Sequence, residues 1–274
     1  MTEPHSTHHI TITGDEVTKV FTSWSRGEPL REWRGLTLLD TYAPGLAPRP
    51  IAARLDSEPP ALTMTRIDGT PLRGTTCTRR SIRALADGLT ALHDAVPAGV
   101  LAEVPRSAWS ADRADARVRR WMAGRPAVPR SPVVGRALAA GETWLAVNRL
   151  ETVSGADAVR PVFGHADGNL ANGLDDGRTV RLIDFEDSGR SDRAFELAEI
   201  VGHPSTWVDT AGFDVPSFLA RFDLPAAEQA RLEHIRRLIA LLWLAALLDD
   251  PGACRRNPPG TDERQARRVL ALLE

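Results

Sequence analysis

Apolar and polar residues alternate in the first part of the chain, as they do in half-buried strands. Residues 8–21 alternate on both sides of a Gly-Asp-Glu turn and predict a β-hairpin. Residues 27–43 place apolar side chains at helical spacing instead, and predict a helix that ends at a Pro-rich segment. Residues 50–55 and 61–67 predict two more strands. The chain therefore begins with a small lobe of strands and one helix.

Helical patterns dominate from about residue 76 onwards. The predicted helices span residues 78–95, 107–123, 131–150, 192–203, 215–221, 225–249 and 261–273. Two strands, at 161–174 and 179–186, interrupt these helices and are joined by an Asp-Asp-Gly turn. The pattern predicts an α+β fold, with a small lobe at 1–68 and a larger helical lobe at 69–274.

Composition narrows the class of protein. Hydrophobic residues make up 42% and charged residues 26% of the 274 residues, and the formal charge is -2, so neither nucleic acid nor a membrane surface is an expected partner. The longest apolar run, 238–248, is too short to span a bilayer, and the N-terminus lacks a signal-peptide pattern. Cys77 and Cys254 have no metal-ligand spacing. We therefore expect a cytoplasmic protein, and nothing in the sequence implies a protein partner.

The strongest chemical signal is a short motif near residue 165. His165, Asp167 and Asn172 follow the order H-x-D-x-x-x-x-N, and Asp184 ends an apolar strand twelve residues later. Phosphoryl transfer from ATP needs a carboxylate that accepts or orients a hydroxyl proton, and an amide and a second carboxylate that hold Mg²⁺. Asp167 is the predicted catalytic base, and Asn172 and Asp184 are the predicted Mg²⁺ ligands. An ionised Asp at the end of a buried strand also needs a partner, which a metal ion would supply.

This motif resembles the aminoglycoside phosphotransferase and choline kinase-like family. In that family the catalytic loop also reads H-x-D-x-x-x-x-N, and the metal-binding strand reads I-D-[FW]-E, which residues 183–186 match. Residues 188–198 are similar to the short turn and helix that follow in the family. The resemblance implies a bilobal protein-kinase-like fold with a β-rich N-terminal lobe and a mostly helical C-terminal lobe.

The resemblance also implies a lysine that meets the ATP phosphates. Of the 34 Lys and Arg residues, only Lys19 is a lysine, and it occupies the position of the family's third strand. The compact ammonium of a lysine suits a tight phosphate site, whereas an ordinary surface position would accept arginine equally well. The family also places a helix carboxylate on this lysine. Glu32 is the preferred candidate, and Glu28, beside Pro29, is the second.

By the same resemblance, residues 62–69 form the hinge that holds adenine. The carbonyl of Thr65 and the N–H of Ile67 would meet the base, with Met64 behind it. The expected cofactors are ATP, with GTP possible, and Mg²⁺. No G-x-G-x-x-G precedes Lys19, so we expect a shortened phosphate-covering loop, with His5-Ser6-Thr7 as one candidate.

A small molecule with a hydroxyl group is the expected acceptor, because the chain between Asp184 and Ser188 leaves no room for a protein-kinase activation loop. An aminoglycoside-like antibiotic would need carboxylates, for which the candidates are Glu196, Asp209, Asp214, Asp249, Asp250 and Glu274. The alternative is an amino alcohol such as choline, ethanolamine or thiamine. A choline-like quaternary ammonium would need an aromatic cage, to which Trp207 and Trp243 could contribute.

Two hypotheses from other classes stay open at this point. A metallohydrolase could use His165, Asp167, Asp184 and His203 as metal ligands. It leaves Asn172 unexplained and predicts that Lys19 is dispensable. A nucleotide-binding protein without turnover would bind Mg-ATP and transfer no phosphate.

Overall fold

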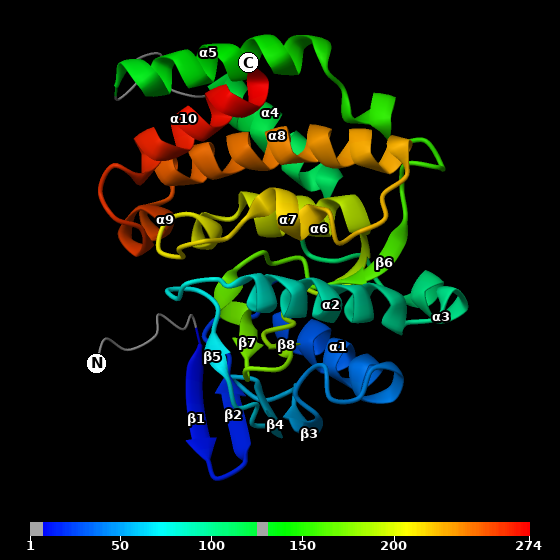
Figure 1. Ribbon diagram of the computed structural model, residues 1–274. Coiled ribbons are helices and arrows are strands. Elements are labelled where there is room, and N and C mark those ends of the chain that lie inside the picture. The colour runs from blue at the N-terminus through cyan, green and yellow to red at the C-terminus, as the bar shows by residue number, and fades with distance from the viewer. Residues whose placement is uncertain (1–7, 125–130) are drawn as a thin grey trace.

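A four-stranded antiparallel sheet and one helix form the N-terminal part of the computed structural model, which describes residues 8–124 and 131–274 (Figure 1). The elements are β1 (His9–Thr13), β2 (Glu16–Val20), α1 (Glu28–Tyr42), β3 (Pro50–Arg54) and β4 (Ala61–Thr65). The strand order is β1-β2-β4-β3, with Lys19 on β2 opposite Ile10 and Leu62. The expected hairpin, helix and two later strands are therefore confirmed. Lys19 lies on the second strand of the described chain.

Helix α1 begins where the chain requires a glycine. Gly27 has φ 78°, a left-handed conformation that favours glycine, and Pro29 follows in the first turn. Leu36 and Leu39 lie on the buried face of α1 and belong to the same core as Leu62 on β4. This packing fixes the helix against the sheet and determines where its charged residues point.

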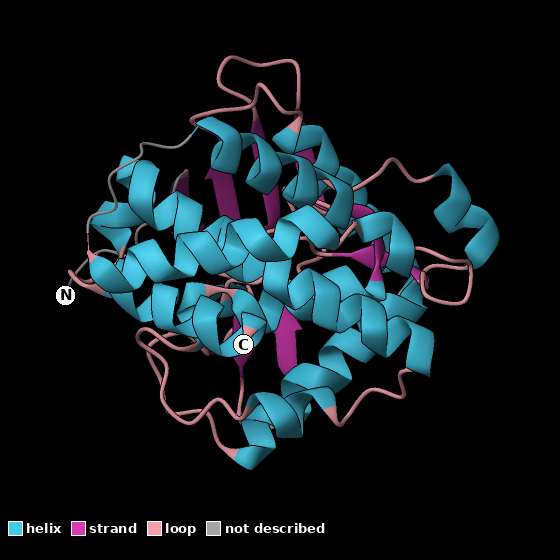
Figure 2. Cartoon of the chain, turned by 90° about the horizontal axis from the view of Figure 1, so that it is seen from above, coloured by secondary structure: helices cyan, strands magenta, loops and turns pink. Residues whose placement is uncertain are grey.

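The rest of the described chain is mostly helical (Figures 1 and 2). The helices are α2 (Arg79–Ala95), α3 (Ala98–Glu103), α4 (Ala111–Gly124), α5 (Pro132–Val147), α6 (Arg193–Gly202), α7 (Val215–Leu219), α8 (Ala226–Asp249), α9 (Pro251–Arg256) and α10 (Thr261–Leu273). Helix α8 is central and packs against α4, α6 and α10. Its apolar segment is buried in this core, and no helix of the described chain is long and apolar enough to cross a membrane.

Helix α2 connects the helical core to the strands around the predicted catalytic residues. A capping box at Thr78 and Ser81 starts it, and its apolar face buries Leu85, Leu89 and Leu92. The helix packs against β6 (Pro161–Gly164) and β8 (Val180–Leu182). This contact holds the segment between those strands at the boundary with the N-terminal sheet.

The two predicted catalytic strands, at 161–174 and 179–186, are shorter than expected, and only part of the first pairs with the second. Strand β6 pairs with β9 (Gly189–Asp192), whereas β7 (Gly173–Asp175) pairs with β8 across the Asp-Asp-Gly turn and with β5 (Thr70–Pro71). The strand prediction over 161–174 was wrong because residues 165–172 leave the extended conformation. They form a loop and a 3-10 turn, η2 (Leu170–Asn172).

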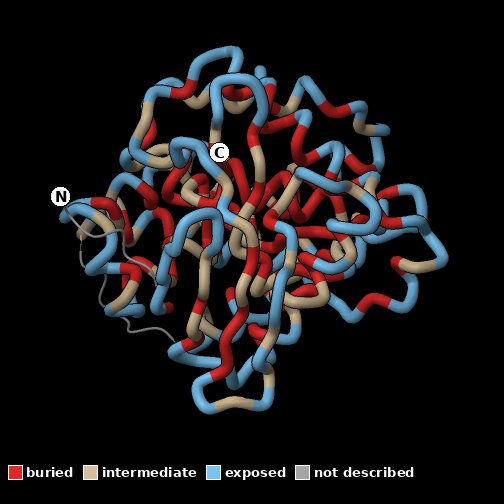
Figure 3. Tube along the Cα trace, turned by 90° about the horizontal axis from the view of Figure 1, so that it is seen from below, coloured by how far each residue is buried: buried red, intermediate tan, exposed pale blue. Residues whose placement is uncertain are grey.

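The predicted fold class is confirmed: the chain has a small antiparallel sheet at its N-terminal end and a helical C-terminal part. Buried segments run through the interior of both parts, and the exposed segments lie mainly in the peripheral loops and the outer strands (Figure 3). Ile10 and Ile12 on the edge strand β1 are exposed, at 45% and 58%. The boundary at residue 68 stays a prediction.

Candidate active site

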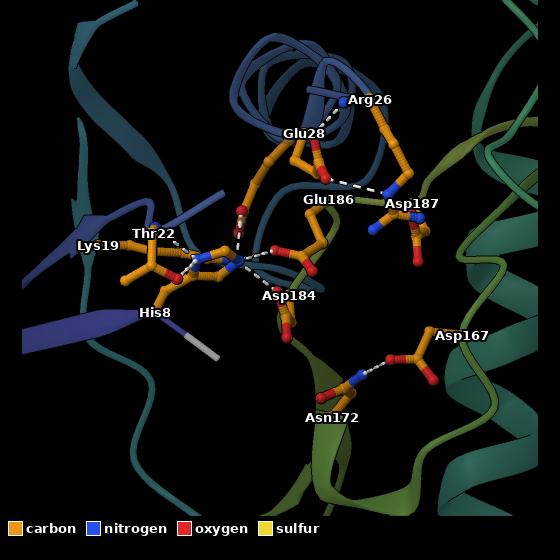
Figure 4. A network of polar contacts seen from close by, with 11 residues as sticks. His8, Lys19, Thr22, Arg26, Glu28, Asp167, Asn172, Asp184, Glu186 and Asp187 are labelled. Carbon is orange, nitrogen blue, oxygen red and sulfur yellow. Dashed lines mark hydrogen bonds and ion pairs between the residues drawn. The ribbon is translucent and has the colours of Figure 1, made fainter. Parts of the chain in front are cut away.

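Lys19 on β2 stands at the centre of a cluster of carboxylates that come from two other segments (Figure 4). Its Nζ donates to Glu32 Oε2 at 2.7 Å, to Asp184 Oδ1 at 2.5 Å and to Glu186 Oε2 at 2.9 Å. Glu32 comes from α1, and the two other acids follow β8. The structure therefore brings the predicted Lys19, Glu32 and Asp184 together, and uses all three N–H groups of the ammonium.

The charge state of Lys19 follows from these partners. Burial opposes its charged form, but the negative charges of Glu32, Asp184 and Glu186 outweigh burial and raise the pKa of Lys19 above its ordinary value. The second candidate partner, Glu28, does not reach Lys19. Its carboxylate accepts from the backbone and side chain of Arg26 instead.

Asp167 and Asn172 form the opposite wall of the site (Figure 4). Asn172 Nδ2 donates to Asp167 Oδ2 at 2.9 Å, and the backbone N–H of Asn169 donates to Asp167 Oδ1 at 2.9 Å. Burial raises the pKa of Asp167 above its ordinary value, although His165 opposes the shift. A raised pKa moves a carboxylate towards the range that suits a general base at neutral pH.

The loop that contains Asp167 is held in place by a buried acid. Glu196 on α6 accepts the backbone N–H groups of His165 at 2.9 Å and Ala166 at 3.0 Å, and Ser191 donates to its other oxygen. Ala166 has φ 61°, where a side chain costs about 1–2 kcal/mol. Glu196 therefore helps to fix a strained loop. The predicted role of Glu196 was only that of a candidate carboxylate for binding a cationic acceptor substrate.

Asp184 also has a left-handed backbone, with φ 69°, which is uncommon for a residue other than glycine. The backbone N–H of Ile183 donates to the carbonyl of Asn172 at 3.0 Å, so Asn172 and Asp184 lie on adjacent chain segments. His165 Nε2 bonds to the carbonyl of Ile183 at 2.8 Å and so links the loop to the same strand. Asp184 keeps 35% of its side chain exposed, which leaves its carboxylate accessible.

Ligand atoms of Glu32, Asp184 and Glu186 all lie within 4.8 Å of one another and could hold a metal ion. Mg²⁺ prefers oxygen ligands, so these three carboxylates fit it chemically. They include the predicted ligand Asp184, whereas the other predicted ligand, Asn172, stands beside Asp167. Glu186 belongs to the motif at 183–186 but had no predicted role, although its position two residues after Asp184 was a usable signal. His8, whose Nε2 lies 2.6 Å from Glu186 Oε2, was not predicted.

The predicted hinge residues lie where β4 ends. Met64 is buried and pairs with Val17 on β2, Thr65 is the last residue of β4, and Ile67 lies in the loop that follows. Their contact with adenine stays a prediction. The candidate phosphate-covering segment His5-Ser6-Thr7 lies outside the described residues.

The acids proposed for a cationic acceptor mostly have structural partners. Asp209 pairs with Arg73, and Asp249 accepts from Trp121. Asp214 and Asp250 cap helices α7 and α9. These four residues therefore make structural contacts in the described structure.

Another acid, Glu199 on α6, was not predicted. It is buried, and its Oε2 has no hydrogen-bond partner among the described residues. Burial, together with the charges of Asp167 and Glu196, raises its pKa to about 8. Glu199 and Asp167 both line a cavity of about 20 Å³, which has room for a water-sized group.

The two tryptophans proposed for an aromatic cage each pack against different side chains. Trp207 packs under the guanidinium groups of Arg264 and Arg268, with Cζ 5.0 and 4.9 Å from the ring centre. Trp243 packs edge-on against His203 at 4.6 Å. Each ring therefore already packs against a side chain of the described structure.

An interlobe ion pair flanks the site. Arg26 Nη1 lies 3.2 Å from Asp187 Oδ1, while Arg26 Nε lies 3.0 Å from Glu28 Oε1. Burial raises the pKa of Asp187 to about 6, although the charge of Arg26 opposes the shift. The pair links the start of α1 to the segment that follows β8 (Figure 4).

The metallohydrolase ligand set does not assemble in the described part of the chain. His203 bonds through Nδ1 to Ser205 at 2.7 Å and packs on Trp243, whereas His165 faces the carbonyl of Ile183. The only group of three or more potential ligands among the described residues is the carboxylate cluster around Lys19. The structure gives this hypothesis no support.

Residues 17–238 match the model of the phosphotransferase enzyme family. No curated protein matches the chain.

Several solved structures share the fold at low identity. A choline/ethanolamine kinase family protein from Mesorhizobium loti is 16% identical, with a TM-score of 0.64 over 99% of this chain and 86% of that one. A spectinomycin phosphotransferase in complex with ADP and spectinomycin is 12% identical, with a TM-score of 0.63 over 98% and 89%. The GDP complex of an aminoglycoside 2'-phosphotransferase is 16% identical, with a TM-score of 0.63 over 100% and 89%.

Proposed function

This chain belongs to the phosphotransferase enzyme family, and from that premise we propose that it transfers the γ-phosphate of ATP to a hydroxyl of a small molecule. One observation carries the proposal. Lys19, Glu32 and Asp184 meet at one wall of the site, and Asp167 bonds to Asn172 at the other. This is the arrangement that phosphoryl transfer between a bound nucleotide and a nearby hydroxyl requires.

Each of these residues has a proposed role. Asp167 orients the acceptor hydroxyl and accepts its proton as the oxygen attacks phosphorus. Asn172 and Asp184 would hold Mg²⁺, which neutralises phosphate charge when it is bound. Lys19 binds the α- and β-phosphates and is oriented by Glu32, while Thr65 and Ile67 contact adenine with Met64 behind them. The phosphate passes directly to the acceptor, without a covalent enzyme intermediate.

We propose an acceptor that carries an amine as well as a hydroxyl. Glu199 is a buried acid that lines the same cavity as Asp167, and no cation of the described chain pairs with it. Its pKa of about 8 leaves it protonated at neutral pH, and an ammonium group of the acceptor would stabilise its carboxylate form and pair with it. Aminoglycoside-like antibiotics and related metabolites come first, and phosphorylation of such an antibiotic would confer resistance. Choline, ethanolamine and thiamine-like amino alcohols are the alternative. The need for ATP and the free cysteines Cys77 and Cys254 favour the cytoplasm.

The test combines binding with transfer. Calorimetry should detect binding of Mg-ATP, and of Mg-GTP if guanine is accepted, and Asp184→Ala should weaken it strongly. Wild-type protein is then incubated with radiolabelled ATP and a panel of aminoglycosides, amino alcohols and sugars without amines. Label should move to an amine-bearing alcohol, and Glu199→Gln should raise the KM for that acceptor more than the KM for ATP. Nucleotide binding without transfer to any acceptor would favour the binding-protein hypothesis. The absence of nucleotide binding would refute the proposal.

A further inference from the structure

His8 lies beside the ammonium of Lys19, although nothing in the sequence motif includes it. His8 Nε2 and Lys19 Nζ bond to the same oxygen, Glu186 Oε2, at 2.6 and 2.9 Å. Two donors that share one acceptor atom must lie close to each other. Whatever anion meets Lys19 at this point therefore also lies within reach of His8.

The hydrogen bonds of His8 determine which ring nitrogen is a donor. The backbone N–H of Thr22 donates to His8 Nδ1 at 3.1 Å, so Nδ1 is an acceptor. In a neutral imidazole the other nitrogen then carries the proton, and Nε2–H donates to Glu186. The imidazole thus presents an N–H donor towards the Lys19 cluster without needing a positive charge.

The ring is held from behind, independently of Glu186. His8 is 6% exposed and packs on Phe21 with ring centres 4.8 Å apart. Phe21 is fully buried, and Lys19 Nζ lies 4.9 Å from the centre of the same ring. The hydrogen bond from Thr22 and the contact with the Phe21 ring would keep the imidazole in place if Glu186 moved away.

We propose that His8 is a nucleotide-binding residue, whose Nε2–H donates to the phosphate group that Lys19 binds. This inference rests on the proposed function. A phosphate oxygen and Glu186 Oε2 are both anionic acceptors, so an incoming nucleotide competes with Glu186 for the same two donors. His8 supplies from a side chain a hydrogen bond to the phosphates that a glycine-rich loop would supply from backbone N–H groups.

Calorimetry with adenosine, Mg-ADP and Mg-ATP tests this role, because only the last two have the phosphates. His8→Ala should weaken Mg-ADP and Mg-ATP about 10- to 100-fold, the range for a hydrogen bond to a charged group, and leave adenosine binding unchanged. His8→Gln, which keeps an N–H donor at a similar reach, should restore most of the affinity. His9→Ala is the matched control, because His9 is the exposed neighbour on β1.

Four results would overturn the inference. His8→Ala could bind Mg-ATP as the wild type does, which would show that His8 contributes nothing to nucleotide affinity. It could also bind Mg-ATP more tightly, which would mean that the contact between His8 and Glu186 blocks the site. The substitution could also weaken the binding of adenosine as much as the binding of Mg-ATP, which would make His8 a structural residue only. If the wild type binds none of the three ligands, the proposed function fails together with this inference, whereas the first three results leave the proposed function intact.

Discussion

The two walls of the site are held in place by different forces. The Lys19 wall is a cluster of charges, in which one ammonium from β2 meets carboxylates from α1 and from the segment after β8. The Asp167 wall is a loop from one lobe, fixed by the buried acceptor Glu196 and by local hydrogen bonds. One wall depends on contacts between the lobes, and the other does not.

This difference separates affinity from catalysis. Opposite charges that converge from two lobes can rearrange when a charged ligand arrives, because the ligand replaces one partner by another. A loop that is held by backbone N–H groups keeps its geometry whether a ligand is present or not. We therefore expect substitutions at the Lys19 wall to change nucleotide binding first, and substitutions at the Asp167 wall to change the rate of transfer first.

The largest expected effect is that of Asp167→Ala on the Asp167 wall. Loss of a general base should lower kcat about 100- to 10,000-fold, while the Kd for Mg-ATP changes little. Single-turnover transfer and calorimetry measure the two quantities separately. Asp40→Ala, at an exposed aspartate of α1, is the matched control. A variant that retains near-normal kcat would remove Asp167 from the proposed mechanism.

Substitutions at the Lys19 wall should change the Kd for Mg-ATP more than they change kcat. Lys19→Ala removes a charged donor and should weaken Mg-ATP about 10- to 100-fold, while Glu32→Gln, which leaves two carboxylates on Lys19, should have a smaller effect. Isothermal titration with Mg-ATP ranks the variants. Equal losses for Glu32→Gln and Glu28→Gln would contradict the pairing, because Glu28 contacts Arg26 instead.

The sequence alone predicted the parts of each wall that short motifs encode. Asp167, Asn172 and Asp184 lie on one stretch of chain, and Lys19 and Glu32 stood out as the single lysine and as an acid on an amphipathic helix. Their convergence is consistent with those predictions. The partners that it missed come from distant parts of the chain: His8 contacts Glu186 across 178 positions. Periodicity carries no information about such contacts, because they depend on how the lobes pack.

Glu196 and Ala166 show the same limit for the loop. An acid on a predicted helix can be solvated, bind a ligand or accept backbone N–H groups, and only the packing of α6 against the loop decides among these. The strand prediction over 161–174 failed for a related reason. Alternation describes side chains, whereas the left-handed backbone at Ala166 turns the chain out of the sheet.

The walls should also differ in their response to pH. Glu199, beside the Asp167 wall, has its pKa raised to about 8, so the folded protein holds a proton there that the unfolded chain releases above about pH 4.5. Between those pH values the folded state binds more protons than the unfolded state, and this group makes stability fall as pH rises, by at most about 1.4 kcal/mol per pH unit. Glu199→Gln should therefore gain stability relative to wild type from pH 5 to pH 8 in denaturant unfolding. Glu103→Gln, at an exposed acid of α3, should run parallel to wild type. Parallel curves for Glu199→Gln and wild type would show that Glu199 is ionised in the folded protein.

The smallest expected effect concerns the second link between the lobes. Arg26 pairs with Asp187 and Glu28, but 49% of its side chain is exposed, so solvent screens the pair. Arg26→Ala should lower the free energy of unfolding at pH 8 by about 1 kcal/mol or less. Arg120→Ala is the matched control, because Arg120 is an exposed arginine of α4.

The pH dependence of this effect distinguishes an ion pair from simple packing. The pKa of Asp187 is about 6 in the folded protein and ordinarily 3.8, so its carboxylate is charged at pH 8 and mostly neutral at pH 4.5. The contribution that Arg26 makes through Asp187 should therefore be present at pH 8 and largely lost at pH 4.5. A destabilisation of the same size at both pH values would mean that Arg26 acts by packing or through Glu28. In that case the contact between Arg26 and Asp187 would add no electrostatic link between the lobes.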